Sequence, residues 1–138
     1  MLLVDLPPGT GDVQMTLAQK AHVDGAVIVS TPQDVALLDA RKGIDMFNQL
    51  KVPILGMVEN MSTHICSNCG HEEHVFGHGG VKAEAEKLGV PLLAEIPLDL
   101  QIRLAADGGA PIAVSQPQSP QAQAFARVAQ ALIAQGVA

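Results

Sequence analysis

Two cysteines separated by two residues, Cys66 and Cys69 in the segment CSNC, are the side chains best suited to chemistry in this 138-residue chain. Thiolates at positions i and i+3 can bind one metal from a single turn, but they are half of the four ligands that a tetrahedral zinc or an iron–sulfur cluster usually takes. The other ligands could come from His71, His74 or His78, or from a second copy of the chain. A redox dithiol and inert thiols are the alternatives, although a redox CxxC normally opens a helix directly after a strand.

A carboxylate follows the first apolar run, in the segment LLVDLPPGTGD from Leu2 to Asp12. An aspartate at the carboxyl end of a strand can hold Mg²⁺ through water, and Asp5 has that place. Gly9 and Gly11 would let backbone N–H groups approach a phosphate. The plainer interpretation is that Asp5 caps a local turn while the two prolines reverse the chain. These residues alone leave both interpretations open.

Other polar residues stand where a structural role competes with a functional one. Asn60 closes an apolar run, so its amide could read the edge of a base or cap the following turn. Asp34 is most simply the N-cap of a helix. Arg41 and Lys42 are expected on a solvated helix face, because an aspartate flanks them on each side.

Apolar runs alternate with amphipathic segments along the chain. The pattern predicts strands over 2–4, 25–30, 52–61 and 90–97, and helices over 12–21, 34–50, 80–89, 98–107 and 119–135. A loop over about 62–79 carries the cysteines. The fold class expected is α/β, with a partial doubly wound parallel sheet flanked by helices in a single domain, 1–138. In such open sheets, ligands bind beyond the carboxyl ends of the strands, and all four of these ends are polar or turn-forming.

Composition narrows the classes of function. Hydrophobic residues make up 48% of the chain, and the formal net charge of −6 argues against a nucleic-acid binder. The sequence has no apolar run long enough to span a membrane and no basic segment ahead of an apolar stretch that would indicate a signal peptide. Two cysteines this close are not a secreted disulfide framework. A cytoplasmic protein without nucleic-acid or membrane partners is therefore expected.

Five segments taken in order, VDLPPGTGD, VSTPQDVALLDARKGIDMF, GMVENMS, CSNCG and IPLD, resemble the Mrp/ApbC family over essentially the whole chain. Members of this family are MinD-type P-loop ATPases that act as iron–sulfur cluster carriers or scaffolds. The combination is specific, because DLPPG alone would indicate only the wider MinD/ParA group, whereas ENMS followed by CxxC indicates the cluster-carrier branch.

The resemblance implies a role for each matching position. Asp5 would be the switch II aspartate near Mg²⁺, and Asn60 would contact adenine. Cys66 and Cys69 would bind a [4Fe–4S] cluster shared between the two subunits of a homodimer. The positions implied to sense the γ-phosphate or to line the base pocket are Gly9, Thr10, Gly11, Asp12, Pro97, Leu98 and Asp99. The implied cofactor is ATP with Mg²⁺, and the implied recipients of the cluster are apo iron–sulfur proteins.

One departure from the family pattern is large. The sequence contains no glycine–lysine P-loop, and it begins at the strand that normally follows the half carrying that loop. We therefore expect the C-terminal half of a longer, MinD-like P-loop NTPase that does not hydrolyse ATP as this chain alone. The uncovered edge of the first strand also leads us to expect a dimer or a larger assembly.

Two other functions compete with cluster carriage. A MinD/ParA-like positioning ATPase would normally lack CxxC and often ends in an amphipathic membrane helix, whereas the last segment here, PQAQAFARVAQALIAQ, is a poor membrane anchor. A small interaction module could instead hold zinc between the CxxC pair and nearby histidines.

Overall fold

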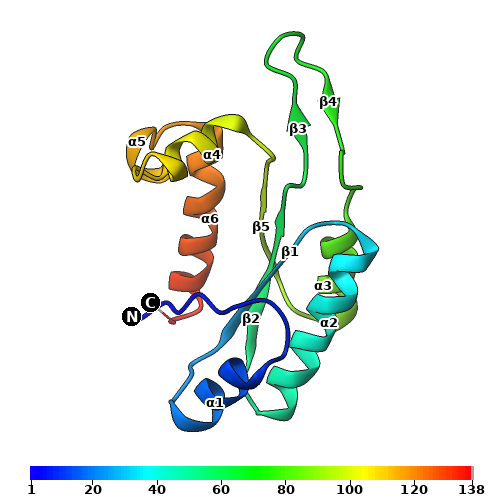
Figure 1. Cartoon of the computed structure of the whole chain (residues 1–138), viewed down its shortest axis with the longest axis vertical. Coiled ribbons are helices and arrows are strands. Elements are labelled where there is room, and N and C mark those ends of the chain that lie inside the picture. The colour runs from blue at the N-terminus through cyan, green and yellow to red at the C-terminus, as the bar shows by residue number, and fades with distance from the viewer. Residues whose placement is uncertain (138) are drawn as a thin grey trace.

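A parallel three-stranded sheet forms the centre of the structure, a computed structural model that describes residues 1–137 (Figure 1). The strands β1 (Ala26–Ser30), β2 (Ile54–Asn60) and β5 (Leu92–Ile96) lie in the order β1-β2-β5. Because parallel neighbours need crossover connections, a helix lies between each pair of strands along the chain. This arrangement confirms the α/β class and the parallel sheet expected from the sequence.

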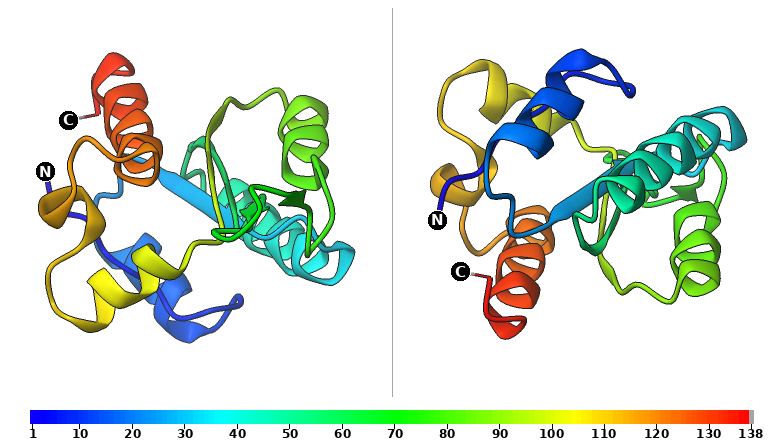
Figure 2. Two further views of the ribbon diagram at one scale, coloured as in Figure 1. Left: turned by 90° about the horizontal axis from the view of Figure 1, so that it is seen from above. Right: turned by 90° about the horizontal axis from the view of Figure 1, so that it is seen from below.

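Helices cover both faces of the sheet (Figure 2). The helices are α1 (Asp12–Lys20), α2 (Asp34–Gln49), α3 (Gly80–Leu88), α4 (Leu100–Asp107), α5 (Ile112–Ser115) and α6 (Pro120–Ala134). Helices α2 and α3 pack on one face, while α6 packs on the other against β5. No helix within residues 1–137 is both long and apolar enough to cross a bilayer.

The apolar core is split by the sheet into two clusters. Met57 packs with Ile28 and Ile44 on the face covered by α2 and α3. Val58, the next residue of β2, packs with Leu132 of α6 on the opposite face. Successive side chains of a strand point to opposite faces of the sheet. Because helices cover both faces, the strands are apolar at successive positions, as the continuous apolar runs of the sequence predict.

Some helix ends carry the capping residues that the sequence indicates, and others do not. Gly89 ends α3 in the left-handed conformation, with φ of 67°, and the Ser119 hydroxyl accepts the Ala122 N–H at the start of α6. The expectation that Asp34 caps α2 was wrong, because Gln33 is the residue before that helix and Asp34 opens it. A carboxylate in the first turn still favours the helix through the macrodipole.

The segment expected as a strand over 2–4 is not one. It carries no strand structure, and Leu2 is 85% exposed. The segment runs crosswise to the strands (Figure 1), with Met1 and Leu3 beside Val27 and Val29 of β1. A strand exists only where a neighbour satisfies its backbone hydrogen bonds, and nothing in residues 1–137 pairs with this segment.

The segment expected as a plain loop over 62–79 contains a short hairpin. The strands β3 (His64–Ile65) and β4 (Glu72–Glu73) pair antiparallel, with His64 opposite Glu73. The hairpin projects beyond the rest of the molecule (Figure 1). The fold therefore presents the cysteine segment on an arm.

Candidate functional site

The parallel sheet gathers the polar strand ends at one edge. Ser30 lies opposite Glu59, and Asn60 lies opposite Ile96, so β1, β2 and β5 end side by side. The loop Pro97–Asp99 therefore begins next to Asn60. In open parallel sheets, ligands bind beyond this edge, where the strands end.

The Asp5 segment lies over this edge and borders an open hollow of about 580 Å³. Asp5, Gly9 and Asn60 are among its lining residues, together with the end of β1. The Asp5 carboxylate is exposed and forms no ion pair within residues 1–137. The structure thus brings Asp5 together with Asn60. Asp12 instead opens α1, where a carboxylate favours the helix dipole.

A residue that the sequence analysis missed holds the proline–glycine turn. Gln14 is buried on α1, and its Nε2 donates hydrogen bonds to the carbonyl oxygens of Pro7 (2.6 Å) and Gly9 (3.0 Å). Gly9 has a φ of 91°, which favours glycine at this position. The signal was weak, because a single glutamine in a short helix resembles an ordinary surface residue.

The Asn60 amide makes the turn-capping contact. Its Oδ1 accepts the backbone N–H of Met61 at 3.0 Å, and Met61 has a φ of 55°. An asparagine side chain stabilises a residue in this strained conformation by satisfying its N–H. The structural interpretation of Asn60 is therefore confirmed, while its contact with adenine stays a prediction.

The Pro97–Asp99 loop lines a second hollow, of about 720 Å³, between the hairpin and α6. The Asp99 carboxylate caps α4 by accepting the Gln101 N–H (2.7 Å), and its other oxygen accepts a hydrogen bond from Gln121 of α6 (2.7 Å). Asp99 therefore fixes the loop to two helices. Arg127 and His78 also line this hollow, so it is polar as well as open.

Both thiols lie in the turn of the β3–β4 hairpin. The Cys66 N–H donates to the His71 carbonyl (2.9 Å), and the Gly70 N–H donates to the Cys66 carbonyl (2.8 Å), which closes the turn. Cys66 is half-buried, Cys69 is exposed, and neither is in a disulfide. Two reduced thiols at the tip of a projecting arm are accessible to a metal or to another molecule.

The turn also favours the thiolate of Cys66. Backbone N–H groups of Asn68 and Cys69, followed by the Cys69 thiol and the nearby His64, lower the pKa of Cys66 below its ordinary value. Burial acts in the opposite direction but is outweighed. Because the thiolate is the form that binds metal, the backbone of the turn prepares this side chain to act as a ligand.

The histidines near the cysteines have other partners. The His74 Nδ1 donates to the Ser62 carbonyl (3.2 Å), and the His74 ring lies 4.2 Å from that of His78. His71 lies beside Glu73. Within the described part of the chain, no group of three or more His, Cys, Asp or Glu is arranged to hold one metal ion. One copy of the hairpin therefore brings two candidate ligands, not four.

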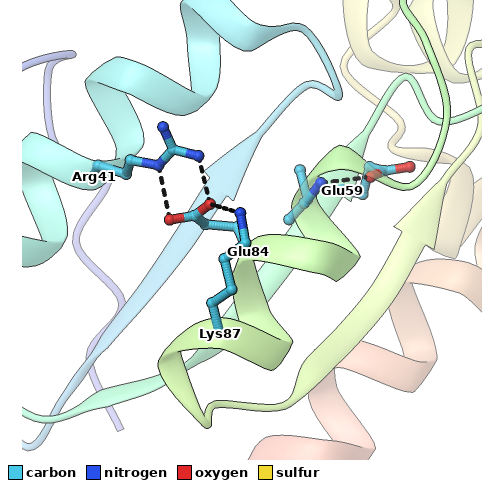
Figure 3. A network of polar contacts seen from close by, with 5 residues as sticks. Arg41, Glu59, Glu84 and Lys87 are labelled. Carbon is cyan, nitrogen blue, oxygen red and sulfur yellow. Dashed lines mark hydrogen bonds and ion pairs between the residues drawn. The ribbon is translucent and has the colours of Figure 1, made fainter.

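An ion pair joins helices α2 and α3 on one face of the sheet (Figure 3). Arg41 donates two hydrogen bonds to the Glu84 carboxylate, at 2.7 and 2.6 Å, and joins α2 to α3. The expectation that Arg41 is simply solvated was wrong, because the 7% exposed Glu84 side chain needs a partner. Lys42 keeps the expected surface role, in an exposed pair with Asp39.

Known proteins share both the sequence and the fold of this chain. It is 57% identical over 128 residues to the iron-sulfur cluster carrier protein of Pseudomonas fragi, covering 93% of this chain and 45% of that protein. It is 52% identical to the Escherichia coli iron-sulfur cluster carrier protein (97% of this chain, 36% of that one) and 48% identical to the mouse iron-sulfur cluster transfer protein NUBPL (96% and 41%). The chain thus spans less than half the length of these relatives.

Solved structures give the same result. A nucleotide-binding protein of Archaeoglobus fulgidus in complex with ADP superposes with a TM-score of 0.70 at 40% identity, over 84% of this chain and 46% of that one. The cell division ATPase MinD of Pyrococcus furiosus gives a TM-score of 0.64 at 27% identity, over 81% and 43%. The family model described as ParA, NUBPL iron-transfer P-loop NTPase, matches residues 1–133. The chain therefore belongs to this family of iron-transfer P-loop NTPases, as the resemblance to the Mrp/ApbC carriers predicts.

Proposed function

We propose that this chain is the cargo-holding part of an ATP-dependent iron–sulfur cluster carrier. The observation that carries the proposal is the projecting hairpin, which holds the reduced thiols of Cys66 and Cys69 on a frame shared with iron–sulfur cluster carriers. A cluster to be handed on must be reachable by its recipient, and an exposed hairpin tip is reachable. The recipients would be apo iron–sulfur proteins.

The cargo would be a [4Fe–4S] cluster held between two copies of the chain. Four thiolates complete such a cluster, and each copy contributes Cys66 and Cys69. A two-fold axis that passes between two hairpin tips would bring the two pairs together. The lowered pKa of Cys66 supports this role because it favours the thiolate, which is the form of cysteine that binds metal.

The strand-end site would hold ATP with Mg²⁺ in the full-length protein. Asp5 fits a Mg²⁺ site, because its carboxylate is exposed and free of ion pairs within residues 1–137. The turn over 9–12 would sense the γ-phosphate through Gly9, Thr10, Gly11 and Asp12, and the base would lie near Asn60 and the loop Pro97–Asp99. Bound Mg²⁺ would neutralise phosphate charge, while this chain's residues orient the nucleotide.

Two alternatives have less support. The exposed thiols could hold zinc in a small interaction module, with further ligands from another chain. A MinD-like positioning ATPase shares the fold, but the solved MinD structure has lower identity (27%) than the cluster carriers. A cytoplasmic location without nucleic-acid or membrane partners is also part of the proposal.

Anaerobic reconstitution with iron and sulfide tests the proposal. The wild-type chain should turn brown and bind four irons per two chains, and Cys66→Ser should remove both the colour and the iron. Ser67→Ala, which changes the residue between the ligands and keeps both thiols, is the matched control and should behave as wild type. A colourless chain that holds one zinc tightly would establish the interaction module instead.

A further inference from the structure

The base of the cysteine hairpin is hydrogen-bonded to the loop that follows β5. The Leu98 N–H donates to the Thr63 carbonyl at 2.8 Å. His64, the next residue of the hairpin, donates from Nδ1 to the Leu98 carbonyl at 3.0 Å. A carbonyl only accepts, so this contact places a proton on Nδ1. The backbone N–H and carbonyl of Leu98 are thus both hydrogen-bonded to consecutive residues at the base of the hairpin, Thr63 and His64.

The other end of this loop is fixed to the body of the molecule. Asp99 binds the backbone of α4 through Gln101 and the side chain of Gln121 on α6. Leu98 therefore lies between a projecting arm and a rigid anchor. A continuous series of hydrogen bonds connects the hairpin that carries Cys66 to the loop beside the strand-end site.

We propose that His64 is a positioning residue that couples the state of the thiol pair to the peptide of Leu98. The strands of the hairpin have few contacts with the body, so its orientation depends on the hydrogen bonds at its base. These are the two bonds to Leu98 and the bonds that the Ser62 N–H and hydroxyl donate to the Ile96 carbonyl. An occupant that holds Cys66 and Cys69 in one arrangement would favour one arrangement of Leu98, and a ligand at the loop would act on the thiols by the same free energy. The inference rests on the proposed roles of the thiols and of the loop.

The chemistry of the bond suggests a matched set of substitutions. His64→Asn keeps an N–H donor at the distance of Nδ1 from the backbone, whereas His64→Gln moves the donor to the distance of Nε2. His64→Ala removes the donor altogether. His22 is 90% exposed and lies away from the hairpin, so His22→Ala is a control for the loss of an imidazole.

Amide hydrogen exchange of Leu98, followed by NMR, tests the coupling. The probe is phenylarsine oxide, which bridges two neighbouring thiols with loss of water and needs no iron–sulfur chemistry. Bridging Cys66 and Cys69 should slow Leu98 exchange on the order of tenfold in the wild type, His64→Asn and His22→Ala. The slowing should fall to about twofold or less in His64→Gln and His64→Ala. A purely structural role would change the baseline rate without changing this response.

Equal slowing in His64→Gln and the wild type, or no slowing in the wild type, would overturn the proposal. The Asn and Gln variants keep a polar side chain of similar size, so the comparison survives even if His64→Ala fails to fold. Failure of the cluster reconstitution would appear as a colourless protein and would leave the exchange result unaffected. The two proposals can therefore fail separately.

Discussion

The carboxylate of Glu84 is buried, and it is stabilised there by charged neighbours. Hydrogen bonds from Arg41 are the main reason that the pKa of Glu84 lies below its ordinary value, and burial opposes them. Lys87 adds a weaker attraction at 3.9 Å. Because Glu84 is buried and Arg41 is half-exposed, the carboxylate depends on the arginine more than the arginine depends on it.

This pair predicts an acid-sensitive contribution to stability. A carboxyl whose pKa is lower in the folded state stabilises the fold above its unfolded pKa, about 4.3 for glutamate, and loses that contribution as the pH falls through the folded value. Glu84→Gln should therefore be less stable at neutral pH and should lose less stability on acidification. Urea unfolding at a series of pH values from about 7 to about 3 measures both effects.

The control for this prediction is Asp39→Asn. Asp39 belongs to the exposed ion pair with Lys42, so its loss should change stability little at any pH. If both variants had the same pH profile, the Arg41–Glu84 pair would not be the source of the effect.

A buried side chain of β2 accepts a hydrogen bond from the N-terminus of helix α3. The Glu59 Oε2 accepts the Val81 N–H at 3.0 Å, and Glu59 is fully buried in β2 (Figure 3). Its Oε1 accepts no hydrogen bond within residues 1–137. A carboxylate at a helix N-terminus satisfies a free N–H and interacts favourably with the helix dipole. Glu59 therefore joins the end of β2 to the start of α3.

Truncating this contact should destabilise the fold. Glu59→Ala removes a helix cap and leaves a cavity, which together should lower the free energy of unfolding by about 2–4 kcal/mol. Glu59→Gln keeps an oxygen that can accept the Val81 N–H, so it should lose less. Glu95→Ala is the matched control, because Glu95 lies opposite Glu59 in the sheet but is exposed. Thermal or urea unfolding that showed equal losses for Glu59→Ala and Glu95→Ala would contradict this role.

Both outer strands of the sheet, β1 and β5, have an edge that pairs with no other strand within residues 1–137. β1 is an edge strand, and Val29, at 60% exposure, lines an apolar groove of about 500 Å³ with Phe125 and Ile133 of α6. Unpaired strand edges and exposed apolar grooves favour association with another chain. The metal-free, reduced chain should therefore associate with itself.

A charge on the edge strand should weaken this association. Val29→Lys should raise the dissociation constant on the order of tenfold, because the lysine would have to be desolvated at the contact. Val114→Lys replaces an even more exposed valine, on α5, and should leave association unchanged. Light scattering over a range of concentrations measures the dissociation constant. A wild-type chain that stays monomeric at every concentration would contradict the prediction.

The alternation of elements and the candidate site were predictable because their signals are local. Apolar runs such as 25–30 form strands wherever they are buried, and Gly89 and Ser119 mark helix ends through their own conformations. The segment 2–4 has the same local pattern, but it forms no strand because that also requires a partner. The hairpin within 62–79 was missed because its strands have two residues each, which is too short for a periodic pattern. They form strands only because they pair with each other.

The sequence by itself determined the α/β class, the parallel sheet and the close spacing of two thiols. It did so because periodicity, turn residues and ligand spacing act over a few neighbouring positions. Only the tertiary structure decided that Arg41 serves Glu84, 43 positions away, and that His64 holds the carbonyl of Leu98. Such pairs depend on how the sheet and helices place distant segments together. No local pattern specifies a partner that only long-range packing brings within hydrogen-bonding distance.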